Sequence, residues 1–224
     1  TALMSMIGAL PGRAFARGTE AATGIEPYLT DGTPGSTPIL LDLNPGPGDS
    51  LPLDWTVIGS RAFFTAYEPT RGREVWVTDG TVAGTQPFVE LWPGPESPSE
   101  IDLWAFGDQL LINAVGSDGN PHLWSAGPAG NLVELGSLDV LGMPVGTDGQ
   151  VEAVGGVLYF SAIATTPTSR LFRTDGTRAG TQEVPLANGV SASFGIMPAN
   201  GGVYFAGWSA GVGTERLYFT DGGA

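Results

Sequence analysis

A short motif centred on Asp-Gly-Thr recurs along the whole 224-residue chain and constrains its fold more than any other feature. Its fullest copy spans residues 73–85, and 48 residues separate the Asp of this copy, Asp79, from Asp31. The next clear copy has Asp175, two periods of 48 further on, and the last has Asp221 after 46 more. Self-similarity at a fixed spacing of roughly 20–50 residues is typical of solenoids, propellers and arrays, so equivalent units are expected.

A second phase of the same repeat supports this spacing. Gly59, Gly107 and Gly155 each open a similar apolar segment, and they follow one another at intervals of 48 residues. One period, residues 51–98, contains short apolar segments bounded by Gly, Pro or Asp-Gly, which are turn residues. Within it we expect four antiparallel strands, at residues 54–58, 61–66, 74–78 and 86–91.

Four strands in a period of this length are the signature of a propeller blade. The sequence therefore predicts an all-β protein with almost no helix, a β-propeller of four-stranded antiparallel blades with about 48 residues per blade. Five blades are expected, the last incomplete, in a single domain that is either whole or part of a longer protein. A stacked β-solenoid is the alternative, although its coils are usually shorter. The expected units are residues 2–52, 53–100, 101–149, 150–195 and 196–224.

Charge and composition exclude several classes of partner. The net charge is −14, which repels phosphate backbones, so nucleic acid is not an expected partner. The absence of cysteine excludes disulfides and thiolate metal sites. No apolar run of about 18 residues occurs, so membrane insertion is not expected. The chain begins at Thr1 without a charged leader, and we interpret this as a processed or cut end.

The repeated motif itself is interpreted as a structural turn. Glycine accepts a positive φ without steric cost, and an Asp carboxylate can accept hydrogen bonds from N–H groups two residues on. A calcium site is the alternative, but one Asp per turn supplies few of the six to eight oxygens that calcium prefers. The third copy replaces the motif with Ser125-Ala126-Gly127, so no cofactor is expected. The predicted turn residues are Asp31, Gly32, Asp79, Gly80, Asp175, Gly176, Asp221 and Gly222.

The aromatic residues fall into two groups. One group recurs at the same third-strand position and is expected to pack between blades: Tyr28, Trp76, Trp124, Phe172 and Tyr218. Other tryptophans lie outside this position, and Trp208 is in a segment rich in Gly and Ser. A tryptophan beside small polar residues can stack on a sugar or a peptide. The predicted ligand-binding residues are Trp55, Trp104 and Trp208.

Catalytic patterns are nearly absent from the sequence. His122 is the single histidine, so a two-His metal site is excluded, and no serine lies in a nucleophile elbow. We expect His122 at the surface, at the start of a strand. Paired carboxylates stay open, for example Asp102 with Asp108 or Glu96 with Glu100, but no spacing singles out one pair. The sequence thus predicts no enzyme and no catalytic residue.

The motif also resembles that of a known family. Residues 74–81, Glu-Val-Trp-Val-Thr-Asp-Gly-Thr, match the Glu-Leu-Trp-x-x-Asp-Gly-Thr repeat of a bacterial family with one conservative change. Residues 26–33 and 170–177 match it more loosely. The resemblance implies a propeller-like repeat protein that is extracellular or located at the bacterial cell surface. It implies no agreed activity and no catalytic residue.

These observations predict a non-catalytic β-propeller module, secreted or on the cell surface, for adhesion or for recognition of a glycan or protein ligand. Fold alone does not specify function, so this expectation rests on the resemblance and on the missing catalytic patterns. Two alternatives remain: a carbohydrate-active enzyme using paired carboxylates, and a purely structural spacer. The oligomeric state is left open.

Overall fold

The structure, a computed structural model, describes residues 2–140, 151–163, 169–186 and 190–222, apart from 34, 36, 99, 210 and 212. These residues form strands and turns, and none of them is in a helix that could span a membrane. By its internal contacts the chain divides into two compact units. Unit 1 comprises residues 1–110, 115–119 and 127–131, and unit 2 comprises residues 111–114, 120–126 and 132–224. The expected single domain stays a prediction.

The first sheet belongs to unit 1 and has the order β1-β2-β3. Where a fourth strand was expected, the structure has only an isolated bridge between Tyr28 and Ile39. The segment that follows β3 is rich in proline, which lacks the N–H group that a strand ladder needs. The strands are β1 (Ala2–Leu10), β2 (Arg13–Glu20) and β3 (Gly24–Thr30).

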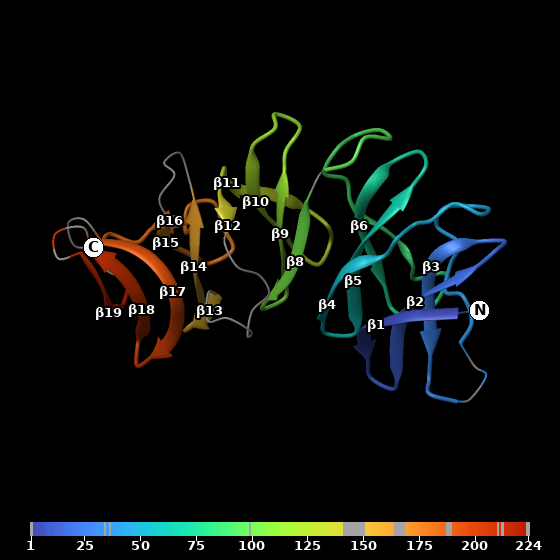
Figure 1. Ribbon diagram of the computed structural model, residues 1–224, viewed down its shortest axis with the longest axis horizontal. Coiled ribbons are helices and arrows are strands. Elements are labelled where there is room, and N and C mark those ends of the chain that lie inside the picture. The colour runs from blue at the N-terminus through green and yellow to red at the C-terminus, as the bar shows by residue number, and fades with distance from the viewer. Residues whose placement is uncertain are drawn as a thin grey trace. The chain divides into compact units, whose positions relative to one another are not determined.

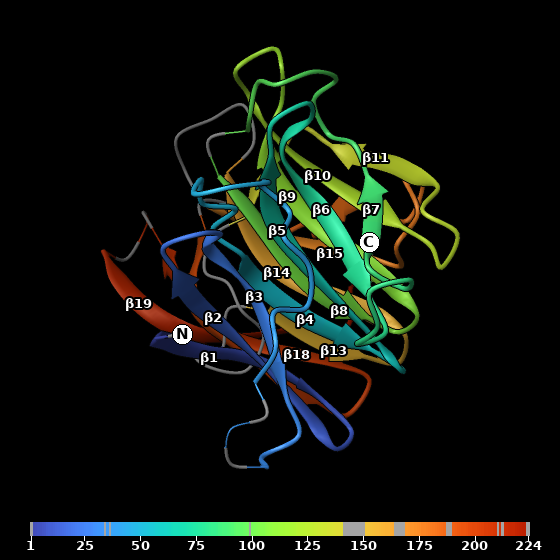
Figure 2. The ribbon, with the colours of Figure 1, turned by 90° about the vertical axis from the view of Figure 1, so that its right-hand side faces the viewer.

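The second sheet, also in unit 1, has the predicted four antiparallel strands in the order β4-β5-β6-β7 (Figure 2). The strand bounds lie within two residues of the expected ones, because Gly59, the Gly80 turn and Pro93 delimit the same segments. All residues from Ala62 to Ala66 are buried, so both faces of β5 are covered. The strands are β4 (Leu53–Ile58), β5 (Arg61–Glu68), β6 (Gly72–Thr78) and β7 (Gln86–Val89).

Three further sheets follow along the chain (Figure 1). The third has the order β11-β10-β9-β8, and its residues are divided between both units. Its strands are β8 (Ile101–Phe106), β9 (Gln109–Val115), β10 (Pro121–Ala126) and β11 (Leu132–Gly136). The fourth contains β12 (Asp139–Val140), β13 (Val151–Val154), β14 (Val157–Ile163), β15 (Arg170–Thr174) and β16 (Gln182–Glu183). The fifth contains β17 (Val190–Ala199), β18 (Gly202–Ser209) and β19 (Thr214–Thr220).

The structure thus confirms the all-β class and the antiparallel, blade-like sheets. Among the described residues there are five sheets, and the last has three strands, as expected. The first and fourth sheets depart from the four-stranded plan, since the first has three strands and the fourth has five. In the fourth sheet β12 and β13 both pair with β14, one at each end of that strand.

The first and fourth sheets each bury one face against the sheet that follows them in the chain. In unit 1, Phe15 of the first sheet is fully buried in a cluster with Ala62 and Val57 of the second. In unit 2, Leu171 of the fourth sheet is equally buried in a cluster with Phe205 of the fifth. In both pairs of sheets the residues that face the neighbouring sheet are apolar, because this contact removes them from water.

Hydrogen bonds to main-chain carbonyls join successive sheets. Arg13 Nη1 donates to the carbonyl oxygen of Gly80 at 2.8 Å. Arg61, 48 residues after Arg13, donates to the carbonyl oxygen of Pro128 at 3.0 Å. Both bonds span 67 residues of sequence, so the same connection is made twice in unit 1.

Candidate functional site

The Asp-Gly-Thr turns are closed by the same bonds in the second and fourth sheets. Asp79 Oδ1 accepts from the backbone N–H of Thr81 at 2.9 Å and from its hydroxyl at 2.7 Å. Asp175 accepts from Thr177 at the same two distances. The Thr81 bonds hold the pKa of the Asp79 carboxyl below its usual range. The turn glycines all have positive φ: Gly32, Gly80, Gly176 and Gly222.

These turn carboxylates are engaged within their own turns. Asp31 likewise accepts from the backbone N–H of Thr33 at 2.9 Å, and this bond lowers the pKa of Asp31. Within the described ranges, no three His, Asp or Glu side chains gather in a way that could hold a metal ion. The geometry of the motif is that of a hairpin turn.

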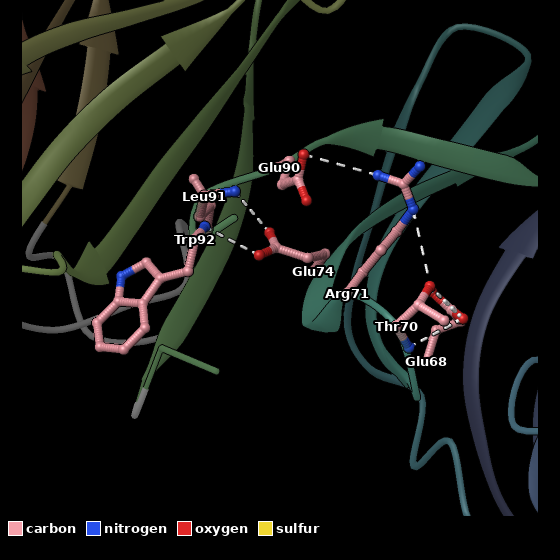
Figure 3. Close-up of polar contacts among 7 residues, drawn as sticks. All are labelled: Glu68, Thr70, Arg71, Glu74, Glu90, Leu91 and Trp92. Carbon is pink, nitrogen blue, oxygen red and sulfur yellow. Dashed lines mark hydrogen bonds and ion pairs between the residues drawn. The ribbon is translucent and has the colours of Figure 1, made fainter. Parts of the chain in front are cut away.

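The motif's glutamate has a different environment from its aspartate. Figure 3 shows the glutamate, Glu74, beside Leu91 and Trp92. Glu74 is fully buried and accepts two backbone hydrogen bonds, from Leu91 at 2.6 Å and from Trp92 at 2.9 Å. Burial raises the pKa of Glu74 to about 7, and the two N–H donors oppose that shift. We call this arrangement the Glu74 clamp, because it fixes the segment after β7 to β6.

Glu26 makes the equivalent contacts in the first sheet. Its carboxylate accepts from the backbone N–H groups of Leu43 at 2.9 Å and Ser50 at 3.1 Å, and burial raises its pKa. In both clamps the first donor lies 17 residues after the glutamate. The sequence interpretation missed both clamps. A signal was available, because Pro-Gly-Pro at residues 45–47 recurs at residues 93–95, at the 48-residue period.

A groove of about 340 Å³ runs beside the Glu74 clamp along the edge strand β7. Arg71 lies at this groove, where its Nη1 is 3.7 Å from Glu90 Oε2 and its Nε is 3.9 Å from Glu68 Oε2 (Figure 3). Thr70 donates to the same Glu68 carboxylate and orients it. The groove is lined by Arg71, Gln86, Pro87, Phe88, Val89 and Glu90.

The backbone of β7 forms part of that groove. β7 pairs with β6 on one side and is the last strand of the sheet on the other. Pro87 lies in it opposite Trp76, and proline is tolerated at sheet edges, where its missing N–H disrupts no ladder. The unpaired side of an edge strand can accept an added strand. The groove therefore combines an unpaired edge, an arginine and the carboxylate of Glu90, and Glu68 lies next to that arginine.

A second polar cluster lies at the bulge in β4. Asp54 has a positive φ of 52°, and its Oδ2 accepts from the Thr65 hydroxyl at 3.0 Å. Arg73 donates to Thr65 Oγ1 at 3.3 Å and to the Leu51 carbonyl at 2.9 Å. Although Asp54 is exposed as a whole residue, partial burial of its carboxyl group raises its pKa. These bonds hold the strained backbone of the bulge in place.

The structure separates the three tryptophans predicted as ligand-binding residues. Trp104 is only 2% exposed, and Trp55 is stacked between Phe15 at 4.5 Å and Phe64 at 4.2 Å. Trp104 lies on β8 and Trp55 on β4, and Trp55 is half-buried between those two rings. Trp208 is 45% exposed, on β18 in the other unit, so binding at Trp208 stays a prediction.

The aromatic residues that recur in the third strand are buried or half-buried. Tyr28, Trp76 and Phe172 are buried, whereas Trp124 and Tyr218 are half-buried. His122 occupies the position of the motif's glutamate in the third sheet. It is half-buried rather than at the surface, because it stacks on Trp124 and contacts Glu134 Oε1 at 2.9 Å.

No protein-family model matches the sequence, and neither does any curated protein. Among solved structures, the chain is similar to a mutant puromycin hydrolase complexed with PGG, with 15% identity and a TM-score of 0.51. The alignment covers 98% of this chain and 38% of that structure. A second puromycin hydrolase structure is 17% identical with a TM-score of 0.50, over 99% of this chain and 40% of that one. The chain thus spans about two fifths of their length.

A third structure, the β-propeller domain of the trilobed protease from Pyrococcus furiosus, has 12% identity and a TM-score of 0.42 over 99% of this chain and 82% of that domain. At these identities the similarity shows the fold alone. The expectation of a non-catalytic module for adhesion or recognition is nevertheless contradicted, because the puromycin hydrolase structures are those of enzymes. The expectation was wrong because it inferred a non-catalytic role from the absence of catalytic motifs in this chain.

Proposed function

We propose that this chain is a β-propeller module of a hydrolase that acts on peptides or peptide-like amides, and that the groove along β7 holds part of the substrate. The observation that carries the proposal is the groove of about 340 Å³ beside an unpaired edge strand. An extended peptide can add to such an edge through main-chain hydrogen bonds, with side chains entering adjacent pockets. The similarity to puromycin hydrolase, over about two fifths of its length, supports the substrate class.

The side chains around the groove suit the ends and side chains of a peptide. Arg71 is 3.7 Å from Glu90 and 3.9 Å from Glu68, distances at which neither pair is a short, direct ion pair. A peptide carboxylate can therefore replace or share these contacts with the guanidinium group. The two glutamates can in turn receive a basic side chain or an amino group.

A binding measurement with matched arginine variants tests this proposal. A set of fluorescently labelled hexapeptides with free carboxyl ends is titrated with the chain, with Arg71→Gln and with Arg178→Gln. Arg178 is the control, because it is an exposed arginine 3.8 Å from a single glutamate, far from the groove in sequence. Loss of a charge-assisted contact is expected to weaken binding about tenfold in Arg71→Gln, which corresponds to about 1.4 kcal/mol. Equal affinities of all three proteins, or no saturable binding of any peptide, would contradict the proposal.

The family resemblance and its implications are part of the same proposal. We propose that the chain is a repeat protein of the bacterial family with the Glu-Leu-Trp-x-x-Asp-Gly-Thr motif, and that it works outside the cytoplasm. What supports this is residues 74–81, which match the motif with one conservative change. Fractionation of the source cells, followed by immunodetection of the chain, tests the location. Recovery in the cytoplasmic fraction alone would contradict it.

A further inference from the structure

The fifth sheet, within unit 2, buries one face and exposes the other. Val203 and Phe205 of β18 are at most 1% exposed, and they pack against the fourth sheet. The alternate residues of the same strand, Tyr204 and Trp208, are 41% and 45% exposed. Since successive residues of a strand point to opposite faces, the exposed face is the one directed away from the fourth sheet.

Large apolar side chains gather on that exposed face. The strand register sets Tyr204 directly opposite Met197 on β17 and Phe219 on β19, and it sets Ala206 opposite Leu217. The rings of Tyr204 and Phe219 are 5.3 Å apart. Met197, Leu217 and Phe219 are 55%, 67% and 50% exposed. With Trp208 they form what we call the β18–β19 face, and neighbouring exposed apolar side chains of this kind often mark an interaction site.

The register also shows which positions these residues correspond to in other sheets. Val203 pairs with Thr220 as Leu158 pairs with Thr174 and as Ala62 pairs with Thr78, and each threonine precedes an Asp-Gly turn. The residues that directly follow Val203, Leu158 and Ala62 therefore occupy equivalent positions in their sheets. These residues are Tyr204, Tyr159 and Phe63, and in the first sheet Phe15, which follows Ala14 opposite Thr30.

The equivalent residues are buried in every one of those other sheets. Phe15, Phe63 and Tyr159 are 0%, 1% and 3% exposed, against 41% for Tyr204. Leu171, the equivalent of Leu217, is likewise fully buried. For Phe15, Tyr159 and Leu171 the next sheet along the chain contributes to the covering cluster. The β18–β19 face thus carries the same kinds of side chain that, in the first and fourth sheets, contact the following sheet.

We propose that the β18–β19 face is a docking surface for a further antiparallel sheet of this same repeat. The occupant would present an apolar face like that of Ala62 and Phe64. It would also offer a main-chain carbonyl of its Asp-Gly turn to the Tyr204 hydroxyl. Tyr159 provides the pattern, because its hydroxyl donates to the Asp221 carbonyl of the following sheet at 3.0 Å.

The proposal is tested on the full chain and on the same chain extended after residue 224 by a copy of residues 53–98, the complete four-stranded repeat. Binding of an apolar fluorescent dye and digestion by chymotrypsin are measured for both. The unextended chain is expected to bind the dye. The extended chain is expected to lose dye binding, and its added repeat is expected to resist digestion.

Matched variants identify the face. Leu217→Glu and Phe219→Ser change exposed side chains, so the unextended chain should keep its circular dichroism spectrum and melting temperature. In the extended chain, either variant should make the added repeat sensitive to chymotrypsin again. Digestion of the added repeat at the same rate in parent and variants, or persistent dye binding, would overturn the proposal. A third result would also overturn it: the unextended chain self-associates, Leu217→Glu abolishes this self-association, and the added repeat stays sensitive to chymotrypsin. The occupant of the face would then be a second copy of the chain.

Discussion

The second and fourth sheets carry the same turn but differ at the first position of the motif. In both, the turn aspartate accepts two bonds from the threonine two residues on, at 2.9 and 2.7 Å. At the first position the second sheet has Glu74, which is buried in its clamp. The fourth sheet has Arg170, whose Nη1 is 2.6 Å from Glu183 Oε1 in a pair that is more than two fifths exposed.

The difference separates local structure from structure that depends on distant partners. The turn bonds join residues two apart, so any copy that keeps Asp-Gly-Thr can form them. The clamp joins Glu74 to backbone donors 17 and 18 residues away, and it needs a side chain that accepts hydrogen bonds. Arginine has donors only, so Arg170 cannot replace the clamp. The corresponding fourth strand, β16, is two residues long, whereas β7 has four.

The largest expected effect comes from removing the clamp. Glu74→Ala leaves the partly buried N–H groups of Leu91 and Trp92 without their acceptor, and an unpaired donor costs about 1–3 kcal/mol. We expect the free energy of unfolding to fall by about 3 kcal/mol. Arg170→Ala, the matched control, should change it by less than about 1 kcal/mol, because its ion pair is solvent-exposed. Urea denaturation of both variants measures this, and equal losses would remove the distinction between the two sheets.

A smaller effect is expected from pH, with a definite sign. The pKa of Glu74 is about 7 in the folded chain and near 4.5 when unfolded, so between these values the folded state holds the extra proton. The contribution of Glu74 to the free energy of unfolding is therefore greatest below pH 4.5. It decreases as the pH rises to 7, by at most about 3 kcal/mol. Glu74→Gln cannot ionise and should flatten the slope between pH 5 and 7, while lowering stability throughout.

The urea midpoints at pH 5, 6 and 7 check this prediction for the parent chain and for Glu74→Gln. Glu26 has a pKa raised in the same direction, so a part of the slope should remain in the variant. The turn aspartates have lowered pKa values and lose their contribution only at more acidic pH, outside this window. Parallel slopes in the two proteins would show that Glu74 does not retain its proton on folding.

The smallest expected effect comes from the turn, which the second and fourth sheets share. Asp79→Ala and Asp175→Ala each remove the acceptor of two bonds to a threonine, at the same distances in both sheets. The two variants should therefore lower the melting temperature by similar, modest amounts. Differential scanning calorimetry of the pair measures this. A much larger loss for one of them would mean that the turn has a role in that sheet beyond its local bonds.

The strands could be predicted because their limits are set by residues with local effects. Asp79 and Gly80 end β6 at the expected position, since a positive φ at glycine and a side-chain acceptor define the turn. The Glu74 clamp could not be derived in the same way. Its donors are backbone N–H groups, which every residue except proline has, so the recurring Pro-Gly-Pro marks the segment but does not show which N–H groups bind the glutamate.

The sequence pattern also could not predict which tryptophans are buried and which are exposed. In a sheet that contacts neighbours on both faces, alternation does not separate buried from exposed positions. Trp104 is buried and Trp208 is exposed, although both lie outside the repeated third-strand position. What distinguishes them is how far other residues cover each ring, and this is a property of the folded structure.

The bonds between successive sheets have a consequence for how such a chain can diverge in sequence. Arg13 and Arg61 donate to the carbonyl oxygens of Gly80 and Pro128, and a carbonyl oxygen is present whatever side chain its residue carries. The turn of the third sheet has lost the Asp-Gly-Thr motif, yet it still receives this bond. A substitution in the receiving turn therefore leaves the acceptor in place, whereas a substitution of the arginine removes the donor, so this contact constrains the side chain of the donor and not that of the acceptor.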